Sequence, residues 1–492
     1  MSAPVTTPAP VHVPRSELER ILDVQRKAFN LEGPPTAEVR RNRIDRLLLA
    51  LLERADDIAE ALGADYGQRP EALTKSFELL AWLPDANDIR ENLEEWMKPT
   101  PLQTPEGQTG FIQNRPLGVV GVIGAWNFPV LLSFQPAVAA LAAGNRVMVK
   151  FPDLHVRTGK VVAEAVAKHF DESEIAVVLG DVQTAQDFSS LQLDHIIFTG
   201  SPAIGRMVAE AAGRNLVPVT LELGGKNPVV VAEDADLGLA AHRIAGTRLL
   251  NGGQICLCPD YVFAPRSKAD DFIAALQDEM TELFPSYYDS PAAVSIVNER
   301  NYQRVTGLID DAVAQGADRI LPVPDTADGS APTQSRLIPP TILTGVPEAA
   351  NISSEEIFGP VIPVYVYDDI DEVITYVQDR PSPLGAYWYG GDGADFQRFL
   401  EKTTSGGVTR NDGISHAFAE GAPFGGVGNS GTGAYHGKVG FDACSHRRPV
   451  LSNDAELGIS DGMAGVAVGS DQVAAMVDQG VAAALADVRS RV

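Results

Sequence analysis

Glu222 and Cys256 are the residues of this chain whose types and settings best support covalent chemistry. Glu222 lies in the segment Leu-Glu-Leu-Gly-Gly-Lys-Asn-Pro (221–228), and Cys256 ends the segment Asn-Gly-Gly-Gln-Ile-Cys. A cysteine thiol attacks carbonyl carbons, and a carboxylate activates the water that later releases the product. A lone cysteine is more often a small buried apolar residue, but the preceding glycines let backbone N–H groups approach a thiolate or an oxyanion. The pair therefore predicts thioester chemistry.

Asn127 is a candidate donor to the oxyanion of such a reaction. It lies in Gly-Ala-Trp-Asn-Phe-Pro (124–129), just after the apolar strand expected at Val119–Ile123. A side-chain amide at the end of a parallel strand can donate a hydrogen bond to a developing negative charge. An asparagine that only shapes a turn is the alternative.

A nucleotide site is expected where the strand His195–Phe198 runs into Thr-Gly-Ser-Pro-Ala-Ile-Gly (199–205). Ser201 suits the N-cap of a helix, and Pro202 suits its first position. The exposed N–H groups of that helix start would face an anion such as pyrophosphate. An ordinary capped helix is the alternative.

Lys150 and Asp153 form a second candidate contact to a nucleotide. Lys150 ends the strand expected at Arg146–Lys150, and Asp153 follows three residues later. A cation and a carboxylate at the carboxyl end of a strand can both hydrogen-bond ribose hydroxyls, and a surface ion pair is the alternative. The G-x-G-x-x-G match at Gly426–Gly431 follows no strand, so we interpret it as a structural loop.

No metal site is expected. Cys258 follows Cys256 closely, but neither a second cysteine pair nor clustered histidines accompany it. Cys444 is isolated and is interpreted as structural.

The elements that would position these residues are helices at first and then alternating strands and helices. Residues 16–100 are expected to be helical, with apolar residues at helical spacing over 43–62. Strands are then expected at 119–123, 146–150, 175–179, 195–198 and 217–222, with helices at 135–143 and 158–169. This alternation predicts an α/β fold with a doubly wound, mostly parallel sheet, which binds nucleotides at the carboxyl ends of its strands.

A second α/β domain is expected to follow. Strands are predicted at 228–231 and 261–264, helices at 237–250 and 269–283, and a polar loop at Asp325–Thr333. In the tail after residue 450, apolar residues at 473, 477, 481, 484, 485 and 488 share one helical face. This pattern favours a helix that packs on its own subunit or on a neighbour over a membrane role.

These patterns give the following domain boundaries. Residues 1–223 hold N-terminal helices and a dinucleotide-binding domain, with a bridging hairpin near 101–118. Residues 224–414 form a catalytic domain that carries the cysteine. Residues 415–450 form a return and oligomerisation segment, and residues 451–492 a tail without an assigned role.

Composition excludes several classes of protein. The net charge of −26 argues against nucleic acids and anionic membranes as partners. Three cysteines in 492 residues are no disulfide framework and indicate a reducing compartment, so a cytoplasmic location is expected. Residues 1–13 lack the pattern of a signal peptide. The uncharged stretch Leu117–Asn145 could span a bilayer by length, but its polar residues, prolines and glycines favour a buried strand, a turn and a core helix.

Six motifs in order make the chain resemble the aldehyde dehydrogenase superfamily over about Leu18–Val450. Besides the motifs of Glu222 and Cys256, they are Ala-Trp-Asn-Phe-Pro (125–129), Phe-Thr-Gly-Ser (198–201), Glu-Glu-Ile-Phe-Gly-Pro (355–360) and Pro-Phe-Gly-Gly-Val-Gly-Asn-Ser-Gly (423–431). The ending over 434–448 is similar to the class 3 branch. The opening over 22–99 resembles the bacterial coniferyl aldehyde dehydrogenases within it.

The resemblance implies a chemical role for several positions. Cys256 would form a thiohemiacetal with an aldehyde, and Asn127 with the Cys256 N–H would hold the oxyanion. Hydride would pass to a nicotinamide, leaving a thioester, and Glu222 would activate the water that releases the acid. Class 3 relatives are typically dimers, so the resemblance also implies a homodimer.

The resemblance also implies the cofactor contacts. Lys150 would bind the adenosine ribose and Glu356 the nicotinamide ribose, with Phe358 packed beside it. The other expected contacts are Asp153, Gly200, Ser201, Gly205, Leu223, Gly224 and Trp126. Asp153 stands where the family usually has a glutamate, and its shorter reach leaves NADP as an alternative to NAD.

Several functions remain open at this point. The first is oxidation of an aldehyde, either aromatic, such as coniferaldehyde, or medium-chain, because Trp126, Phe128 and Leu131 are expected to line an apolar funnel. A dehydrogenase that passes the acyl group to coenzyme A would not need Glu222. A cofactor-independent cysteine hydrolase would need a histidine beside the thiol, with His416 and His436 as candidates. A non-catalytic NAD-binding protein would not need the three reactive residues together.

Overall fold

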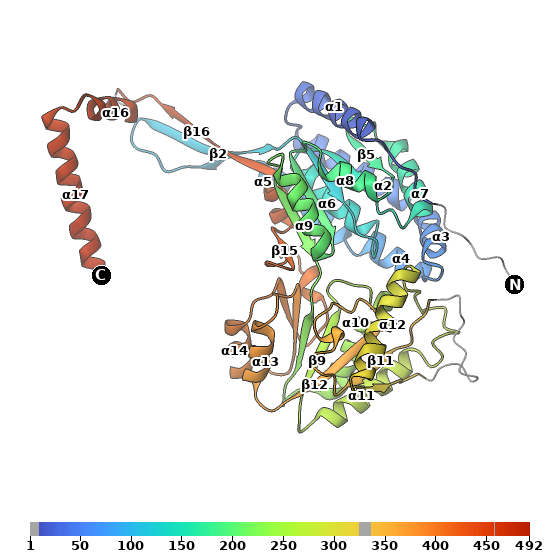
Figure 1. Ribbon diagram of the computed structural model, residues 1–492. Helices are drawn as coiled ribbons and strands as arrows, with labels where there is room; N and C mark the ends of the chain where they lie inside the picture. Colours follow the sequence, from blue (N-terminus) through green and yellow to red (C-terminus); the bar gives the residue numbers. More distant parts are fainter. Residues whose placement is uncertain (1–8, 324–335, 457) are drawn as a thin grey trace. The chain divides into compact units, whose positions relative to one another are not determined.

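The computed structural model describes residues 9–323, 336–456 and 458–492 (Figure 1). It divides into two compact units. The larger comprises Met1–Trp96 and Arg115–His446, and the smaller comprises Met97–Asn114 and Arg447–Val492. The loop expected at Asp325–Thr333 lies outside the described residues.

The larger unit opens with helices, as expected. They are α1 (Arg15–Glu32), α2 (Ala37–Leu52), α3 (Ala55–Tyr66), α4 (Glu71–Thr74), the π-helical η1 (Lys75–Leu80) and α5 (Leu83–Met97). The apolar pattern over residues 43–62 belongs to two helices, because the chain turns between α2 and α3. Leu51 before this turn and Ile58 after it are both buried, so the spacing of buried residues alone does not reveal the break.

The first sheet confirms the predicted doubly wound arrangement. Its elements are β3 (Val119–Ile123), α6 (Leu131–Ala142), β4 (Arg146–Lys150), α7 (Val156–His169), β5 (Ile175–Val178), α8 (Val182–Ser189), β6 (His195–Gly200), α9 (Pro202–Gly213), β7 (Val219–Leu223) and β15 (Gly431–Thr432). The strand order is β15-β7-β6-β3-β4-β5, and only β15 runs antiparallel to its neighbour. The chain winds outward from β3 to β5 and then from β6 to β7, so the strand order reverses between β3 and β6. Ligands of such sheets bind outside the carboxyl ends of the strands at this reversal.

Helix α6 begins at Leu131, four residues before the expected start. The cause is a distant carboxylate: Glu78 Oε2 accepts hydrogen bonds from the N–H groups of Val130 (2.9 Å) and Leu131 (3.1 Å). These are among the N–H groups that a helix start leaves without a partner in the helix. The uncharged stretch Leu117–Asn145 therefore forms a buried strand, a turn and a core helix.

The second sheet lies in the same unit. Its elements are β8 (Asn227–Val231), α10 (Leu237–Leu249), the 3-10 turn η2 (Leu250–Gly253), β9 (Pro259–Pro265), α11 (Ala269–Leu283), α12 (Glu299–Ala314), β10 (Asp318–Ile320), β11 (Thr341–Thr344), η3 (Asn351–Ser353), β12 (Val361–Tyr367), α13 (Ile370–Gln378), β13 (Gly385–Tyr389), α14 (Ala394–Lys402) and β14 (Gly407–Arg410), followed by η4 (Ser415–Phe418) and α15 (Gly437–Ala443). The strand order is β10-β11-β12-β9-β8-β13-β14, parallel except for β10.

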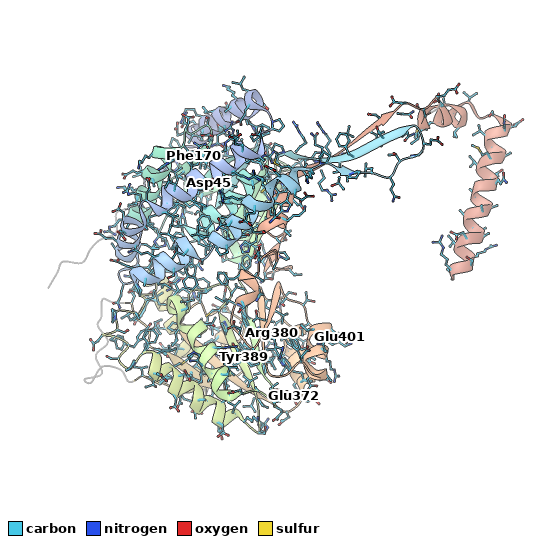
Figure 2. The ribbon with its side chains drawn as sticks, turned by 180° about the vertical axis from the view of Figure 1, so that it is seen from behind. Asp45, Phe170, Glu372, Arg380, Tyr389 and Glu401 are labelled. Carbon is cyan, nitrogen blue, oxygen red and sulfur yellow. The ribbon has the colours of Figure 1, made fainter. Side chains whose placement is uncertain are left out.

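Alternate residues of the central strand β8 enter different hydrophobic clusters. Val229 and Val231 belong to a cluster with buried residues of α10 and α11, such as Phe272. Val230 belongs to a cluster on the other face with residues of α13 and α14, such as Phe399. This period of two matches a strand covered by helices on both faces. The side chains that fill these layers, including Tyr389 of β13, are drawn in Figure 2.

The smaller unit contains a three-stranded sheet and two helices. They are β1 (Thr100–Pro101), β2 (Gln108–Pro116), β16 (Ser445–Asn453), α16 (Ile459–Val468) and α17 (Asp471–Arg491), with the strand order β1-β2-β16. β1 and β2 pair antiparallel over the region expected as a hairpin. Helix α17 carries the apolar face read from the sequence, and its side chains are exposed. Across the three described ranges, no helix has both the length and the hydropathy required to span a bilayer.

Candidate active site

The candidate active site lies in the larger unit, at the carboxyl ends of β3, β6 and β7, beside the reversal in strand order. Asn127 follows β3, Gly200 ends β6 and Glu222 is the penultimate residue of β7. Cys256 lies in the turn between η2 and β9. Asn127 and Cys256 line the same cavity, so the nucleophile and the amide meet although they are far apart in the sequence.

The turn that carries Cys256 has an unusual backbone. Residues 251–253 all have left-handed φ values between 52° and 74°. A Cβ on the last of these glycines would overlap the backbone of Gly359, so a glycine is required there. The Asn227 side chain donates to the carbonyl oxygens of Cys256 (2.8 Å) and Cys258 (2.9 Å). These contacts fix the cysteine turn on the first residue of β8.

Asn127 is bound to the same turn. Its Nδ2 donates to the carbonyl oxygen of Gln254 at 3.2 Å. Its own carbonyl oxygen accepts from the Tyr66 hydroxyl (3.1 Å), Arg69 (3.1 Å) and Asn251 Nδ2 (3.2 Å). The amide is therefore held beside the segment that ends in the nucleophile, as a preorganised oxyanion donor requires.

Burial controls the ionisation of the reactive groups. Together with the smaller effect of the carboxylates of Glu356 and Glu222, it raises the pKa of the Cys256 thiol to about 12. Burial also raises the pKa of Glu222 well above its usual range and that of Glu356 to about 8. Negative charges on these groups oppose one another, so the site binds more protons at neutral pH than the free side chains would. A positive charge nearby would favour the thiolate.

A cavity of about 150 Å³ leads to Cys256. Its lining is mainly apolar and aromatic, with acidic side chains among it. The lining includes Phe77, Trp82, Asp85, Asp88, Phe128, Leu131, Phe418, Glu420, Phe424, Tyr435 and His436. Phe128 and Leu131 thus line the expected funnel, whereas Trp126 does not belong to its lining.

Trp126 instead packs against the segment that contains Glu356. Its ring meets the edge of the Phe358 ring at a centroid distance of 5.2 Å, and Phe358 has a left-handed φ of 51°. A Cβ on Gly224 would overlap the carboxylate of Glu356, so that carboxylate lies against the glycine. Within the described residues, Oε1 of Glu356 is buried and has no hydrogen-bond partner. Glu356, Phe358, Trp126 and Gly224 therefore form one cluster with an acceptor for a hydroxyl group.

Lys150 is buried at the end of β4. Its Nζ donates to the carbonyl oxygens of Phe151 (2.8 Å) and Gly180 (2.9 Å). Burial lowers its pKa to about 8, and the carboxylate of Asp153 opposes that shift. A second cavity nearby is lined by Asp153, Gly180 and Lys160, and by residues of the N-terminal segment 10–13.

The β6–α9 turn has the expected form. Ser201 Oγ accepts a hydrogen bond from the N–H of Ile204 at 3.4 Å, and Pro202 is the first helical residue. A Cβ on Gly205 would overlap the side chain of Leu223 at the end of β7, so the helix packs closely on that strand. Gly200 ends β6 and Ser201 caps α9 beside the reversal in strand order, where N–H groups of a helix start attract anions.

The G-x-G-x-x-G match at Gly426–Gly431 forms a structural loop, as expected from its context. Gly431 pairs with Glu222 across the antiparallel β15–β7 contact, and the N–H of Leu223 donates to the carbonyl oxygen of Ser430 at 3.0 Å. A Cβ on Gly431 would overlap the carbonyl oxygen of Leu221. The loop supports the backbone of the glutamate and does not open a helix.

Neither candidate histidine is hydrogen-bonded to Cys256 in the part of the chain that the structure describes. His416 Nδ1 pairs with the Thr409 hydroxyl at 2.8 Å, and His436 stacks on Phe424 at 5.0 Å. Burial lowers the pKa of both rings to about 4. The cysteine hydrolase therefore lacks its imidazole base.

The other cysteines are buried and form no disulfide. The Cys258 thiol lies 3.5 Å from the carbonyl oxygen of Thr247, and Cys444 is fully buried. Over residues 9–323, 336–456 and 458–492, no three histidine, cysteine or acidic side chains gather closely enough to hold a metal ion.

The sequence interpretation missed several residues that hold the site together. The Gln254 side chain donates hydrogen bonds to the carbonyl oxygens of Asn251 and Ser295. Its Oε1 accepts one from the N–H of Val297. Tyr435 enters the cavity from a segment far along the chain. Neither position carries a local pattern that distinguishes it from an ordinary core residue, so only the long-range folding reveals it.

Comparisons with known proteins agree with this geometry. Residues 9–450 match the model of the aldehyde dehydrogenase family. The chain is 41% identical over 436 residues to the coniferyl aldehyde dehydrogenase of a Pseudomonas species, covering 88% of this chain and 90% of that protein. It is 35% identical to aldehyde dehydrogenase family 3 member A2 of Macaca fascicularis, covering 88% of each.

Solved structures are similar as well. The substrate-bound Staphylococcus aureus AldH matches with a TM-score of 0.84 at 33% identity, over 90% of this chain and 95% of that one. The Mycobacterium tuberculosis aldehyde dehydrogenase complexed with NAD+ matches with a TM-score of 0.80 at 28% identity, over 91% and 92% of the two chains.

Proposed function

The chain belongs to the aldehyde dehydrogenase family, and on that premise we propose that Cys256, Glu222 and Asn127 carry its reaction. The reaction itself is the oxidation of an aldehyde to a carboxylic acid, with a nicotinamide cofactor as the oxidant. The observation that supports the roles of Cys256 and Asn127 most strongly is the shared cavity: both residues line it, and the Asn127 amide is bound to the turn that carries the thiol.

The thiol of Cys256 gives its proton to solvent, and the sulfur adds to the carbonyl carbon of the aldehyde. The resulting oxyanion accepts hydrogen bonds from Asn127 Nδ2 and from the N–H of Cys256. A bound nicotinamide would supply the hydride acceptor that takes the aldehyde carbon to the oxidation level of a thioester on Cys256. The ionised form of Glu222 then takes a proton from a water molecule whose oxygen attacks the thioester. The carbon–sulfur bond breaks, the acid leaves and the thiolate regains a proton.

The residues around Glu356 fit the cofactor. Its buried Oε1 has no hydrogen-bond partner in the described chain, and a ribose hydroxyl would supply the missing donor. Phe358 and Trp126 offer an apolar wall beside it. Gly200, Ser201 and Gly205 would line the pyrophosphate, with Leu223 and Gly224 beside the adjoining strand end. Lys150 and Asp153 would bind the adenosine ribose, and we propose NAD, with NADP as the alternative that the shorter Asp153 leaves open.

The substrate that the cavity favours is an aromatic aldehyde. Phe77, Trp82, Phe128, Phe418 and Phe424 surround the path to Cys256, and aromatic rings pack well against one another. A relative that is 41% identical carries the name coniferyl aldehyde dehydrogenase, so coniferaldehyde is the first compound to test. A medium-chain aliphatic aldehyde is the second candidate for such an apolar path.

We also propose a homodimer in the cytoplasm. The apolar face of α17, with Val481 62% exposed and Leu485 48% exposed in the single chain, would be covered by a second copy. The low cysteine content supports a reducing compartment.

The test of these roles is the rate of cofactor reduction by purified protein with coniferaldehyde, benzaldehyde and a medium-chain aldehyde, each with NAD or NADP. Wild type should reduce the cofactor, and Cys256→Ala should not. Cys258→Ala is the matched control, because that thiol is buried two residues away, and it should remain active. Equal rates for wild type and Cys256→Ala would contradict the assignment of the nucleophile.

A further inference from the structure

The carboxylate of Glu222 faces two hydroxyl groups that the reaction described above does not use. Thr199 and Glu222 are register partners on the parallel strands β6 and β7, so their side chains leave the sheet on the same face. The segment that holds Tyr435 reaches this place from the other side, because Gly431, four residues earlier, pairs with Glu222.

All of these polar atoms are buried. Both carboxylate oxygens of Glu222, the Thr199 hydroxyl and the Tyr435 hydroxyl have no hydrogen bond within the described residues. Glu222 is 2% exposed, Tyr435 1% and Thr199 7%. Buried polar groups in folded proteins are almost always hydrogen-bonded, to protein or to an ordered water. Four such atoms together therefore indicate a site for a small polar ligand.

Tyr435 is near both reactive groups. Burial raises the pKa of its phenol well above the usual range; the charges of Glu222 and Cys256 raise it further, and the Thr199 hydroxyl lowers it. The side chain lines the cavity that contains Cys256. A phenol with so high a pKa keeps its proton at neutral pH, so it can donate a hydrogen bond but cannot act as the base.

We propose that Tyr435 and Thr199 are positioning residues that hold a water molecule against Glu222, on the path to the carbon bonded to Cys256. A buried water needs two to four polar partners, and these three side chains provide them. The inference rests on the function proposed above and concerns only its second half: oxygen–carbon bond formation, proton transfer to Glu222 and cleavage of the carbon–sulfur bond.

If Tyr435 acts only on the water, its loss should affect release of the acid and leave formation of the thioester unchanged. Tyr435 donates to the water or to Glu222 and touches neither the hydride nor the oxyanion. Loss of its hydroxyl should therefore slow release of the acid by about 10- to 100-fold, the usual effect of a misplaced reactant, and should leave formation of the thioester within about twofold of wild type. Reduced cofactor would then appear as a rapid burst of one equivalent per active site, followed by a slow steady state.

The experiment is rapid-mixing measurement of cofactor reduction by the full chain with NAD and benzaldehyde, for wild type, Tyr435→Phe and Thr199→Val. Tyr389→Phe is the matched control. That hydroxyl is also buried and without a partner in the described chain, but it belongs to β13 of the second sheet (Figure 2). Its burst and steady-state rates should equal those of wild type. In a Glu222→Gln background, Tyr435→Phe should slow acid release by less than about twofold further, because the two groups act on one step.

A Tyr435→Phe variant whose steady-state rate equals that of wild type would overturn the proposal. So would a loss of the burst itself, because Tyr435 would then act on thioester formation or on folding. An additive effect of Tyr435→Phe in the Glu222→Gln background would also contradict it. Failure of the proposed function would look different, since neither wild type nor the control would reduce the cofactor.

Discussion

At the scale of single residues, burial sets the reactivity of the site more than hydrogen bonding does. The pKa of the Cys256 thiol is raised to about 12, in contrast to cysteines activated by a nearby cation. The free enzyme therefore holds a protonated, slowly reacting thiol. An uncharged thiol resists oxidation while the enzyme waits for its cofactor and substrate.

This leads to a prediction for alkylation of the thiol without cofactor. Because the pKa is raised, the thiolate is rare at neutral pH and its fraction rises about tenfold per pH unit up to the pKa. The rate constant for inactivation by iodoacetamide should therefore keep rising from pH 7 to 9 without a plateau, but by less than about tenfold per unit, because Glu356 gains its charge over this range. The measurement is residual activity against time at each pH, with wild-type protein.

Glu356→Gln provides a second arm of that experiment. At pH 9 the carboxyl of Glu356, whose pKa is about 8, is mostly ionised and opposes the thiolate. Its removal should lower the pKa of the thiol and speed alkylation at pH 9 relative to wild type. A plateau in the wild-type rate below pH 8, or slower alkylation of the variant, would contradict this account.

The sequence was informative at this scale where chemistry imposes a local pattern. Glu222 and Cys256 stand in glycine-rich segments, and the left-handed turn before the cysteine explains those glycines. Tyr435 could not be identified in this way, because its position near Glu222 depends on a strand contact between distant segments.

At the scale of elements, a buried ion pair connects the N-terminal helices to the oxyanion donor. The side chains of Arg69 and Glu78 are both fully buried, and Arg69 Nη2 lies 2.9 Å from Glu78 Oε1. Arg69 also donates to the carbonyl oxygen of Asn127, and Glu78 accepts from the first N–H groups of α6. The pair thus fixes both ends of the turn between β3 and α6.

Glu78→Gln should destabilise the protein by about 3 to 5 kcal/mol, because it leaves the Arg69 cation buried without its partner. Urea unfolding gives the free energy. Glu71→Gln is the control: it breaks an exposed pair with Lys75 and should change stability by less than about 1 kcal/mol. Equal effects of the two substitutions would show that the buried pair is not the source of the stability.

Predictions of elements succeeded where local periodicity dominates. The strands Val119–Ile123 and Arg146–Lys150 and the helix Ala269–Leu283 have the expected bounds. The start of α6 was wrong by four residues because Glu78, a distant side chain, satisfies the N–H groups there. The helix α8 was missed, since its eight residues form too short a segment for a periodic signal.

At the scale of the whole molecule, the doubly wound sheet and the second α/β sheet could be predicted from the alternation of strands and helices. The strand order could not, because register and neighbour choice depend on contacts across the chain. The domain boundaries drawn from the sequence stay a prediction. The tail forms a helix with the expected apolar face. The residues of that face are exposed in the single chain, so packing of the helix against a neighbouring chain is the prediction to test.

Helix α17 should contribute to association. If Val481 and Leu485 are covered by a second copy, the double substitution Val481→Asp and Leu485→Asp should weaken the dimer at least tenfold, because it buries two unpaired charges. Analytical ultracentrifugation measures the dissociation constant. Gln479→Glu, on the opposite face of the same helix, should leave it unchanged. A monomeric wild-type protein, or an unchanged dissociation constant in the double variant, would contradict the expectation.

The central claim is that Cys256 carries the acyl group and Glu222 releases it. The most direct measurement is the intact mass of Glu222→Gln protein quenched after one turnover with NAD and benzaldehyde, with peptide mapping of any adduct. We expect an added benzoyl group on Cys256, which accumulates because its hydrolysis is slow, and no adduct when Cys256→Ala is combined with Glu222→Gln. Turnover without a trapped acyl group, or an adduct on another residue, would contradict the account.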